Sequence, residues 1–292
     1  MEDSSSMSLT VALPSTLTAE ASTLREKTVK MGFIARVLAV FKVDQVVLYC
    51  DDVSYIEDQR LMKKLLDYAV CPQYLRKKFF PLDPHLKYVG LMPPLRTPNH
   101  PLEKSIRDLP NLSYREGLVV KRLDEEKYLV DVGLDKPIAV KGGKLREGMR
   151  VIVEIRKDEE EVKAKLVARR DVPFYFGFRV QSTRGGLREV VERYGKEALV
   201  IATSKYGKSI VEIVEELQQE LSTRSNILLL FGSPLRGLYD IAKREGCDLD
   251  SIVDHVVNFI PGQGTETVRT EEALCAVLAV INVLLRLKPL TK

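Results

Sequence analysis

The sequence predicts an α/β protein in which one α/β domain is split and a small β-barrel is inserted between its two halves. Strands alternate with helices over residues 8–80 and again over residues 175–292, which is the pattern of parallel βαβ units. Five short strands follow one another closely in the middle of the chain, as in small barrels. We therefore expect residues 1–84 and 171–292 to form the split domain, and residues 85–170 to form the barrel with its linker.

Composition and charge narrow the classes of protein. With 45% hydrophobic and 29% charged residues among 292, the chain can bury a core, and disordered, collagen-like and coiled-coil classes are excluded. A net charge of only +4 excludes a uniformly basic protein. Residues 85–170 nevertheless carry 19 Lys and Arg against 14 Asp and Glu, so the whole positive excess lies in this middle stretch. A basic barrel suits nucleic-acid binding, although Lys and Arg also protect the edges of strands.

Cysteine spacing and apolar segments bear on the location of the protein. The four cysteines form no C-x-x-C pair and lie in or beside apolar runs, so we expect free thiols, a reducing cytoplasmic location and no structural zinc. Met1–Ser8 is acidic and serine-rich, unlike a signal peptide. The longest apolar block, Ala273–Leu285, is shorter than the roughly 20 residues that span a bilayer. The sequence thus predicts a soluble cytoplasmic protein.

The first stretch predicts two strands and two helices. Apolar residues such as Leu24, Met31 and Leu38 recur at the spacing of one helix face. The expected elements are strand Leu9–Leu13, helix Thr18–Phe41, strand Gln45–Cys50 and helix Ser54–Val70.

The middle stretch predicts an extended linker and then a barrel of the OB or S1-like kind. Six prolines between residues 84 and 110 disfavour helix. Turn signals at Gly142-Gly143 and Glu147-Gly148 separate the later strands. The expected strands are Gly117–Arg122, Lys127–Leu134, Lys136–Val140, Arg150–Arg156 and Val162–Arg169.

The third stretch returns to alternating strands and helices. Its last helix is apolar on nearly all faces, so we expect it to be buried, either partly against a second copy of the chain or entirely in a single-chain core. The expected strands are Ala198–Thr203, Ile227–Phe231 and His255–Ile260, and the expected helices are Ser209–Leu221, Leu238–Arg244 and Thr270–Leu287.

Common catalytic motifs are missing from the chain, but two loops indicate a ligand site. G-x-G-x-x-G, the P-loop, G-x-S-x-G and H-E-x-x-H do not occur, and three scattered histidines, His85, His100 and His255, predict neither a metal site nor a catalytic triad. Residues 232–237 and 261–269 follow predicted parallel strands, where α/β sheets bind ligands. Either loop alone could be a tight turn; the two together favour a site.

These loops resemble the cofactor motifs of a known class of enzyme. The segments FGSPLRGL and NFIPGQGTETVRTEEA are similar to those of SPOUT-class RNA methyltransferases, and GFIARVLAVFKVDQVVLY resembles the arginine-bearing motif of the same class. The match is best to the archaeal and eukaryotic RNA methyltransferase family with an OB-like insertion, over essentially the whole chain. The resemblance implies a SPOUT-type knotted parallel sheet, with S-adenosylmethionine bound in a trefoil knot and a homodimer formed through the C-terminal knot region.

The resemblance also implies roles for individual residues. Arg36 matches the functional arginine of the class; because it stays protonated, it would bind a phosphate or stabilise developing charge, although a random helix arginine more often pairs with an acid. The implied RNA contacts are Arg236, Arg269, Lys121 and Arg122. The implied cofactor shell is Thr203, Ser204, Gly232, Ser233, Ile260, Pro261, Gly264, Thr265 and Val268.

Two departures from the class bear on the atom that would be methylated. The ribose-methylating branch usually has Asn where this chain has Lys30, and its last loop carries a Ser-Leu-Asn-Val-Ser type pattern where residues 265–269 read TETVR. These changes favour methylation of a base, such as a uridine nitrogen, over the 2′-hydroxyl. Glu266 could be a general base, but its place before the last helix favours a helix cap.

The leading hypothesis is therefore a homodimeric S-adenosylmethionine-dependent methyltransferase acting on ribosomal or other structured RNA. An RNA-binding scaffold that keeps the fold without catalysis is the main alternative. A small-molecule enzyme on a doubly wound sheet is disfavoured, because dinucleotide and P-loop motifs are missing and the inserted barrel would be unexplained.

Overall fold

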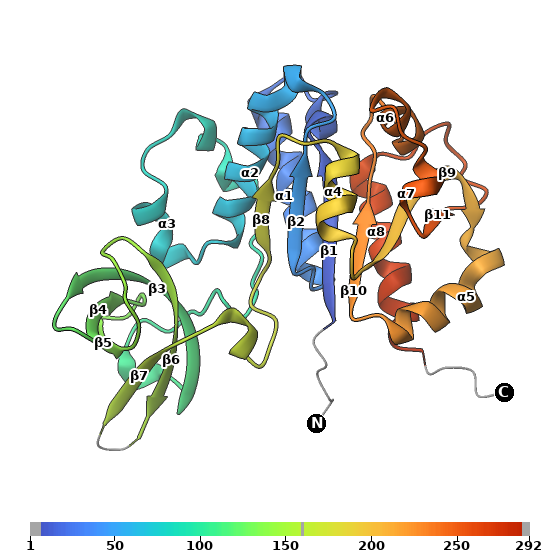
Figure 1. The fold of residues 1–292 in the computed structure, drawn as a ribbon. Helices are drawn as coiled ribbons and strands as arrows, with labels where there is room; N and C mark the ends of the chain where they lie inside the picture. Colours follow the sequence, from blue (N-terminus) through green and yellow to red (C-terminus); the bar gives the residue numbers. More distant parts are fainter. Residues whose placement is uncertain (1–6, 159–160, 288–292) are drawn as a thin grey trace. The chain divides into compact units, whose positions relative to one another are not determined.

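The computed structural model describes residues 7–158 and 161–287, and most of the acidic N-terminal segment Met1–Ser8 lies outside them (Figure 1). Contacts within the chain divide it into two compact units. The sheet unit comprises Met1–Ala69, Pro84–Pro94 and Phe178–Lys292, and the barrel unit comprises Val70–Asp83 and Leu95–Gly177. Over the described residues, no helix is both long and apolar enough to cross a membrane.

The sheet unit is built on six parallel strands in the order β11-β9-β10-β1-β2-β8, which confirms the predicted parallel α/β sheet. The two N-terminal strands lie beside C-terminal ones, since β1 pairs with β10 and β2 with β8. Both ends of the sequence therefore form one sheet. The strands are β1 (Ser8–Pro14), β2 (Gln45–Tyr49), β8 (Arg179–Ser182), β9 (Leu199–Ser209), β10 (Asn226–Leu230) and β11 (His255–Asn258).

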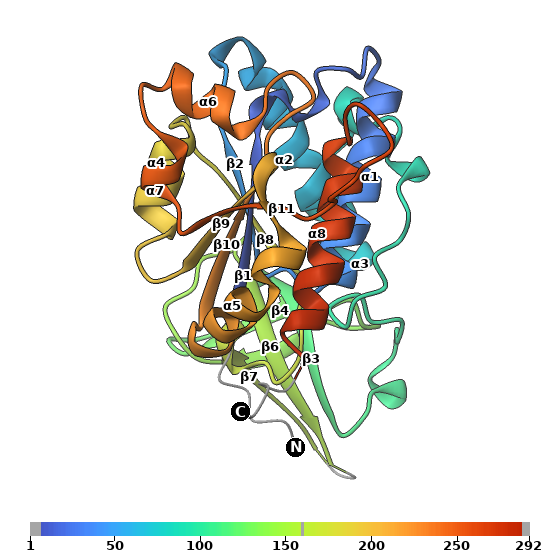
Figure 2. The same ribbon diagram turned by 90° about the vertical axis from the view of Figure 1, so that its right-hand side faces the viewer.

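Helices cover both faces of this sheet. Leu187, Leu238 and Leu249 from α4, α6 and α7 share one buried cluster with side chains of the central strands. Helices α1 and α8 lie side by side on the other face (Figure 2). The helices of this unit are α1 (Leu24–Val40), α2 (Ile56–Val70, the last residue of which belongs to the other unit), α4 (Leu187–Tyr194), α5 (Ile210–Thr223), α6 (Leu238–Arg244), α7 (Leu249–Ile252) and α8 (Thr270–Leu284).

An excursion interrupts the pairing of β9 with β11. Val256 pairs with Ala202 but the next residue, Val257, pairs with Lys208, so residues 203–207 leave the ladder and return to it. Gly207 lies at the point of return, where a Cβ atom would stand 2.4 Å from the Val256 carbonyl oxygen. Because that distance is too short for any side chain, the close approach of the two backbones requires glycine. The predicted trefoil knot concerns this part of the chain and stays a prediction.

The barrel unit is a closed barrel with the strand order β3-β4-β5-β7-β6, which confirms the predicted five-stranded barrel. Its interior is filled by apolar side chains, among them Val119, Tyr128, Val130 and Val153. The strands are β3 (Leu112–Arg122), β4 (Lys127–Asp131), β5 (Ile138–Lys141), β6 (Arg150–Lys157) and β7 (Val162–Val167), and one helix, α3 (Gln73–Phe79), belongs to this unit.

A buried charge network inside the barrel unit uses part of its positive charge. The carboxylate of Glu116, which is 1% exposed, accepts a hydrogen bond of 2.6 Å from Nε of Arg150 and lies 3.6 Å from Arg169. Burial raises the pKa of Glu116, and the two guanidinium groups oppose that rise. Arg115 is equally buried and donates to the carbonyl of Val132 at 2.8 Å. Arg115 is buried, whereas the side chains of Arg150 and Arg169 stay 34% and 30% exposed, so these arginines hold the barrel together while two of them still reach solvent.

Several elements differ from the sequence expectation for local reasons. Helix α1 begins at Leu24 rather than Thr18, because Thr23 and Glu26 form a capping box with hydrogen bonds of 3.2 and 2.9 Å. The proline-rich linker forms three short 3₁₀ turns, Pro84–Leu86, Val89–Leu91 and Ile106–Asp108, in place of a fully extended chain. Strand β8 and helices α3, α4 and α7 were not predicted; each is eight residues long or shorter.

The close approach at Gly207 gives a stability prediction. Gly207→Ala should lower the free energy of unfolding by about 1–3 kcal/mol, because the new methyl group overlaps backbone atoms that cannot move aside. Gly90→Ala is the matched control, since its Cβ meets nothing within 4 Å. Urea denaturation followed by circular dichroism measures both. Equal stability of the two variants would show that the strands are not in this contact.

Candidate functional site

One pocket lies at the carboxyl ends of β9, β10 and β11, where parallel sheets bind ligands. Its volume is about 390 Å³, within the usual range for a small-molecule site. Three loops and the start of α8 form its wall. The lining residues lie in three segments, 203–206, 231–240 and 257–270, together with Ala273 and Val277.

The loop after β10 is a tight turn closed by a serine. Ser233 Oγ accepts hydrogen bonds from the backbone N–H groups of Leu235 (3.3 Å) and Arg236 (3.2 Å), and the Ser233 N–H donates to the Arg236 carbonyl at 2.9 Å. Gly232 approaches the same carbonyl so closely that a Cβ would be 2.9 Å from it. The sequence Gly-Ser-Pro-Leu-Arg-Gly therefore sets the shape of this wall of the pocket.

Arg236 ties this loop to the end of β2. Its Nη2 lies 2.9 Å from Asp52 Oδ2, and its Nη1 lies 3.8 Å from the fully buried carboxylate of Asp51. Asp51 also accepts hydrogen bonds from Ser15 Oγ (2.8 Å) and the Thr16 N–H (3.0 Å). Hydrogen bonds from Ser54 and from Arg236 lower the pKa of Asp52 to about 2. The network fixes the loop between the ends of β1 and β2.

Polar contacts join the excursion of β9 to the loop after β11. Asn258 Nδ2 donates to the Lys205 carbonyl, and Lys205 Nζ donates to the Glu266 carbonyl, both at 3.3 Å. Within the second loop, Gln263 Nε2 donates to the carbonyls of Thr265 (2.8 Å) and Glu266 (3.1 Å). Two walls of the pocket are thereby held together.

The start of α8 contributes to the wall of the pocket. Glu272 accepts a hydrogen bond of 2.9 Å from the N–H of the N-cap residue, Arg269. The prediction that Glu266 caps this helix is therefore wrong, because the carboxylate three residues beyond the N-cap does so. Thr270 Oγ1 donates to the Gly232 carbonyl at 3.1 Å and so joins the helix to the loop after β10.

Lys30, at the position where the ribose-methylating branch has Asn, is buried beside the start of α8. Its ammonium group pairs with Glu20 and lies 2.9 Å from the carboxylate of Glu271, in the first turn of α8. The side chain is 7% exposed. Lys30 therefore ties α1 to the first turn of α8, next to the pocket-lining residue Thr270.

The structure brings most of the predicted cofactor residues together. There are three exceptions in the loop after β11 that do not line the pocket over the described residues: Pro261, Gly264 and Thr265. The predicted residues that line it are Thr203, Ser204, Gly232, Ser233, Ile260 and Val268, together with Arg236 and Arg269.

The remaining predicted residues lie elsewhere. Arg36 is on α1, where its Nη1 donates to the Pro94 carbonyl at 3.3 Å. Along the same face of α1, Val29, Phe33 and Val40 are 47%, 46% and 54% exposed. Lys121 and Arg122 are exposed at the end of β3 in the barrel unit.

Some lining residues were not predicted. Asn258, the last residue of β11, donates a hydrogen bond to the excursion of β9, and its only sequence signal is its position shortly before the glycine-containing loop. Tyr239 and Asp240 line the pocket from the first turn of α6. Ala273 and Val277 line the pocket from α8 and lie four residues apart, on one face of the helix. From the sequence pattern alone, this face is predicted to be buried but not to line a pocket.

The chain combines a parallel sheet that has a loop-lined pocket at its strand ends with a closed five-stranded barrel, and so defines an α/β protein with an inserted barrel. In general, parallel sheets bind ligands at this edge and small barrels commonly bind oligonucleotides. Comparison with known families identifies the protein further. The chain belongs to the family described as "Putative RNA methyltransferase", which matches residues 8–281.

Individual relatives agree with this assignment. An uncharacterized protein of Halobacterium salinarum is 33% identical over 291 residues, covering 93% of this chain and 98% of that protein. The 28S rRNA (uridine-N(3))-methyltransferases of Drosophila melanogaster and Homo sapiens are 30% and 29% identical; each match covers 94% of this chain, which spans 61% of the fly protein and 77% of the human one.

One solved structure that matches is the SpoU methyltransferase AviRb from Streptomyces viridochromogenes in complex with AdoMet. The match covers 95% of this chain and 57% of the AviRb chain. The TM-score is 0.38 and the sequence identity is 10%.

The contacts of Asp52 give a titration prediction. Ser54→Ala should raise the pKa of Asp52 from about 2 toward its ordinary 3.8, because the side-chain hydrogen bond from Ser54 is the largest cause of the shift. Arg236→Met should raise it as well, because Arg236 supplies both a hydrogen bond and a positive charge. Carboxyl-detected NMR titration measures the pKa. Since the pKa is lowered in the folded protein, the stability that Asp52 contributes is present above pH ~4 and is lost as the pH falls toward 2. An unshifted Asp52 in the wild type would contradict the geometry.

Proposed function

We propose that this protein is an S-adenosylmethionine-dependent RNA methyltransferase that methylates N3 of a uridine in large-subunit ribosomal RNA. The observation that carries the proposal is the pocket at the ends of β9, β10 and β11, in a chain of the "Putative RNA methyltransferase" family. The named activity of the fly and human relatives supports the uridine N3 position.

The pocket has the chemistry that S-adenosylmethionine needs. Ile260, Val268 and Val277 offer apolar surface for the faces of the adenine ring, and backbone groups of the three loops can bond its edge. The hydroxyls of Thr203, Ser204 and Ser233 and the carboxylate of Asp240 supply polar partners for the ribose and amino-acid ends. Pro261, Gly264 and Thr265 would complete the shell from the loop after β11. When bound, the cofactor supplies an electrophilic methyl group on a sulfonium centre.

The reaction would form one N–C bond and break one S–C bond, with S-adenosylhomocysteine as the leaving group. The positive charge of the sulfonium is lost in this step, and release of the N3 proton to the surroundings balances it. The work of this chain is therefore to place N3 in line with the methyl group and to keep water out. Negative charge develops on the uracil oxygens as N3 loses its proton. Arg36, always protonated, suits stabilisation of that charge or a grip on a neighbouring phosphate.

The surroundings of Lys30 support methylation of a base. Its ammonium group is engaged by Glu20 and Glu271, so this position holds helices together and does not present a polar amide toward a ribose. The last loop also differs from the Ser-Leu-Asn-Val-Ser type pattern of the ribose-methylating branch, since it reads Thr265-Glu266-Thr267-Val268-Arg269.

RNA capture falls to the basic residues that face solvent. Lys121 and Arg122 on the barrel suit phosphate contacts, as does Arg269 beside the pocket. Arg236, in contrast, is held by Asp51 and Asp52, so its main role is to hold the pocket loop.

The outer face of α1 supports a homodimer. Val29, Phe33 and Val40 expose apolar surface on both sides of Arg36, at positions that share one helix face. A second copy of the chain covering this face would bury it and would place Arg36 at the subunit boundary. Val283 on α8, 54% exposed, adds apolar surface in the C-terminal region that the resemblance assigns to the dimer.

A substitution in the pocket tests cofactor binding. Ala273→Phe should weaken S-adenosylmethionine binding by at least about tenfold, ~1.4 kcal/mol, because the ring occupies the pocket. Ala276→Phe, three residues further along α8 and outside the pocket lining, should bind as the wild type does. Isothermal titration calorimetry gives the affinities, and circular dichroism checks folding. Saturable binding that Ala273→Phe leaves unchanged would place the cofactor elsewhere.

Substitution of Arg36 separates transfer from binding. Arg36→Ala should lower methyl transfer to unmodified ribosomal RNA about 100-fold, as expected for loss of one electrostatic stabiliser, with cofactor affinity unchanged. Arg25→Ala, an exposed arginine on the same helix, is the control. Incorporation of labelled methyl groups measures transfer. Normal turnover by Arg36→Ala would remove its catalytic role, and RNA binding without transfer by the wild type would favour the scaffold.

A further inference from the structure

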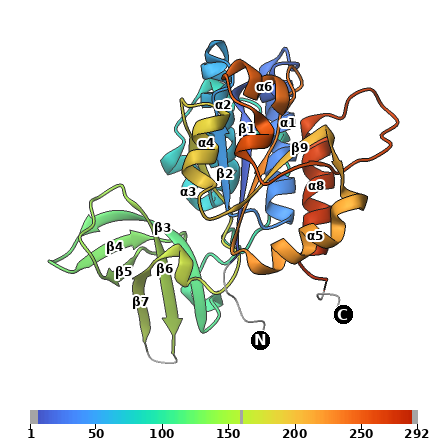
Figure 3. The ribbon, with the colours of Figure 1, turned by 45° about the vertical axis from the view of Figure 1, so that its right-hand side comes forward.

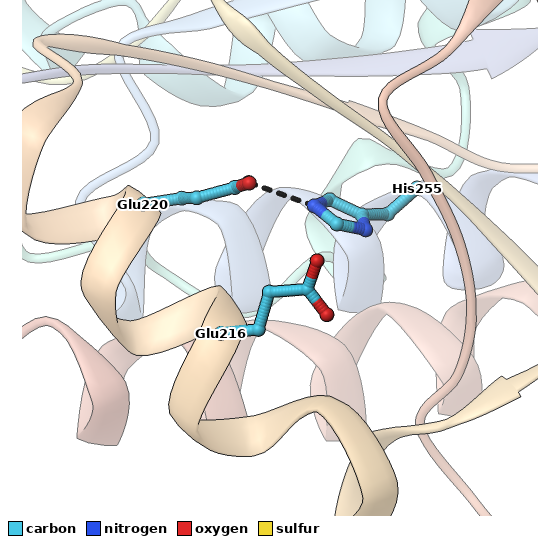
Figure 4. A group of neighbouring side chains, drawn as sticks. All are labelled: Glu216, Glu220 and His255. Atoms are coloured by element: carbon cyan, nitrogen blue, oxygen red, sulfur yellow. Dashed lines mark hydrogen bonds and ion pairs between the residues drawn. The ribbon is translucent and has the colours of Figure 1, made fainter.

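Three side chains with metal-binding atoms meet between α5 and β11, within the sheet unit. Glu216 and Glu220 lie one turn apart on α5, and His255 is the first residue of β11 (Figure 4). One ligand atom from each of the three lies within 4.8 Å of the other two. His255 Nε2 is 2.7 Å from Glu220 Oε2, and the Glu216 carboxylate points toward the same imidazole.

Both elements that carry these side chains are fixed by packing. Helix α5 belongs to the sheet unit, and its side chains Ile213, Leu217 and Leu221 are buried there. Next to His255, the backbone N–H of Val200 donates to the Asp254 carboxylate at 2.7 Å, and the Asp254 N–H donates to the Val200 carbonyl at 3.0 Å. The three ligand atoms are therefore brought together before any ion binds, which lowers the ordering cost of binding.

The charges around the cluster favour a cation. Helix α5 contains four glutamates and neither lysine nor arginine. Glu216 and Glu220 stand at i and i+4, where like charges destabilise a helix. The imidazole of His255 is hydrogen-bonded to one of them. A divalent ion between the two carboxylates would offset their repulsion.

We infer that Glu216, Glu220 and His255 form a divalent metal site of the Zn²⁺ type. An imidazole nitrogen and two carboxylate oxygens form a ligand set that zinc accepts, with the remaining position open to water. Mg²⁺, which prefers oxygen ligands and keeps its own water, suits the imidazole poorly. No motif spacing predicts the site, since 35 residues separate Glu220 from His255 and only the sheet brings them together.

The site joins two segments that lead to the pocket. Helix α5 follows the excursion of β9 at residues 203–207, and β11 precedes the loop at residues 259–269. A metal ion bound by both would hold these segments in register. The inference does not depend on methyl transfer, because metal binding can be measured without RNA or cofactor.

Zinc titration of the full-length, untagged chain tests the site. Competition with a chromophoric chelator should give one saturable site per chain. Glu216→Gln and His255→Gln should each weaken zinc binding by about tenfold or more, because each removes one ligand of three. Glu215→Gln removes the same charge from α5 outside the cluster and should leave the affinity unchanged. Circular dichroism confirms that the variants fold.

Cobalt separates this site from the cysteines. Co²⁺ bound by His255 and the glutamates should give weak visible bands with no intense thiolate charge-transfer band, although the chain has four free thiols. Absence of saturable binding in the wild type overturns the inference. Binding that survives both Glu216→Gln and His255→Gln, or that shows the thiolate band, overturns it equally.

Discussion

The register of β11 against β9 is the constraint on which the rest of the sheet unit depends. Two consecutive residues of β11 pair with β9 residues that lie on either side of the excursion 203–207. Gly207 makes this possible, since it lets the returning backbone reach Val256. The pairing delivers three things to one edge of the sheet: the excursion itself, the loop after β11 and the start of α8. These segments and the loop after β10 line the pocket. Figure 3 shows the ribbon of β9, α5 and α8 in the sheet unit.

Polar contacts then make the pocket rigid. Arg236 fastens the loop after β10 to Asp51 and Asp52, Thr270 fastens α8 to that loop, and Lys205 fastens the excursion to the loop after β11. Each contact joins segments that are distant in the sequence. A site whose walls are already ordered loses less conformational entropy when a ligand binds. Buried charge thus has a positional role here, and the ion pairs of Lys30 behind α8 follow the same logic.

The sequence predicts what depends on local pattern. Alternating strands and helices placed the pocket loops at strand ends, and close-spaced strands predicted the barrel. Contacts between residues distant in the sequence could not be predicted from local pattern. Arg236 binds Asp52, which lies 184 positions away, and Glu116 binds Arg150 only once the barrel has formed. Short elements such as β8, with four residues, carry too little periodicity to be recognised. The place of Glu266 before the last helix favours it as the cap, but the observed N-cap at Arg269 gives that role to Glu272, three residues further on.

Analysis of methylated nucleosides tests the central claim most directly. Unmodified large-subunit ribosomal RNA is incubated with the full-length protein and S-adenosylmethionine, digested to nucleosides and examined by mass spectrometry against authentic standards. The proposed function, which draws on the pocket, the charge around Lys30 and the named activity of the fly and human relatives, predicts 3-methyluridine as the product. A 2′-O-methylated nucleoside would contradict base methylation. No methylated nucleoside, with intact cofactor binding, would contradict the assignment of this RNA as substrate.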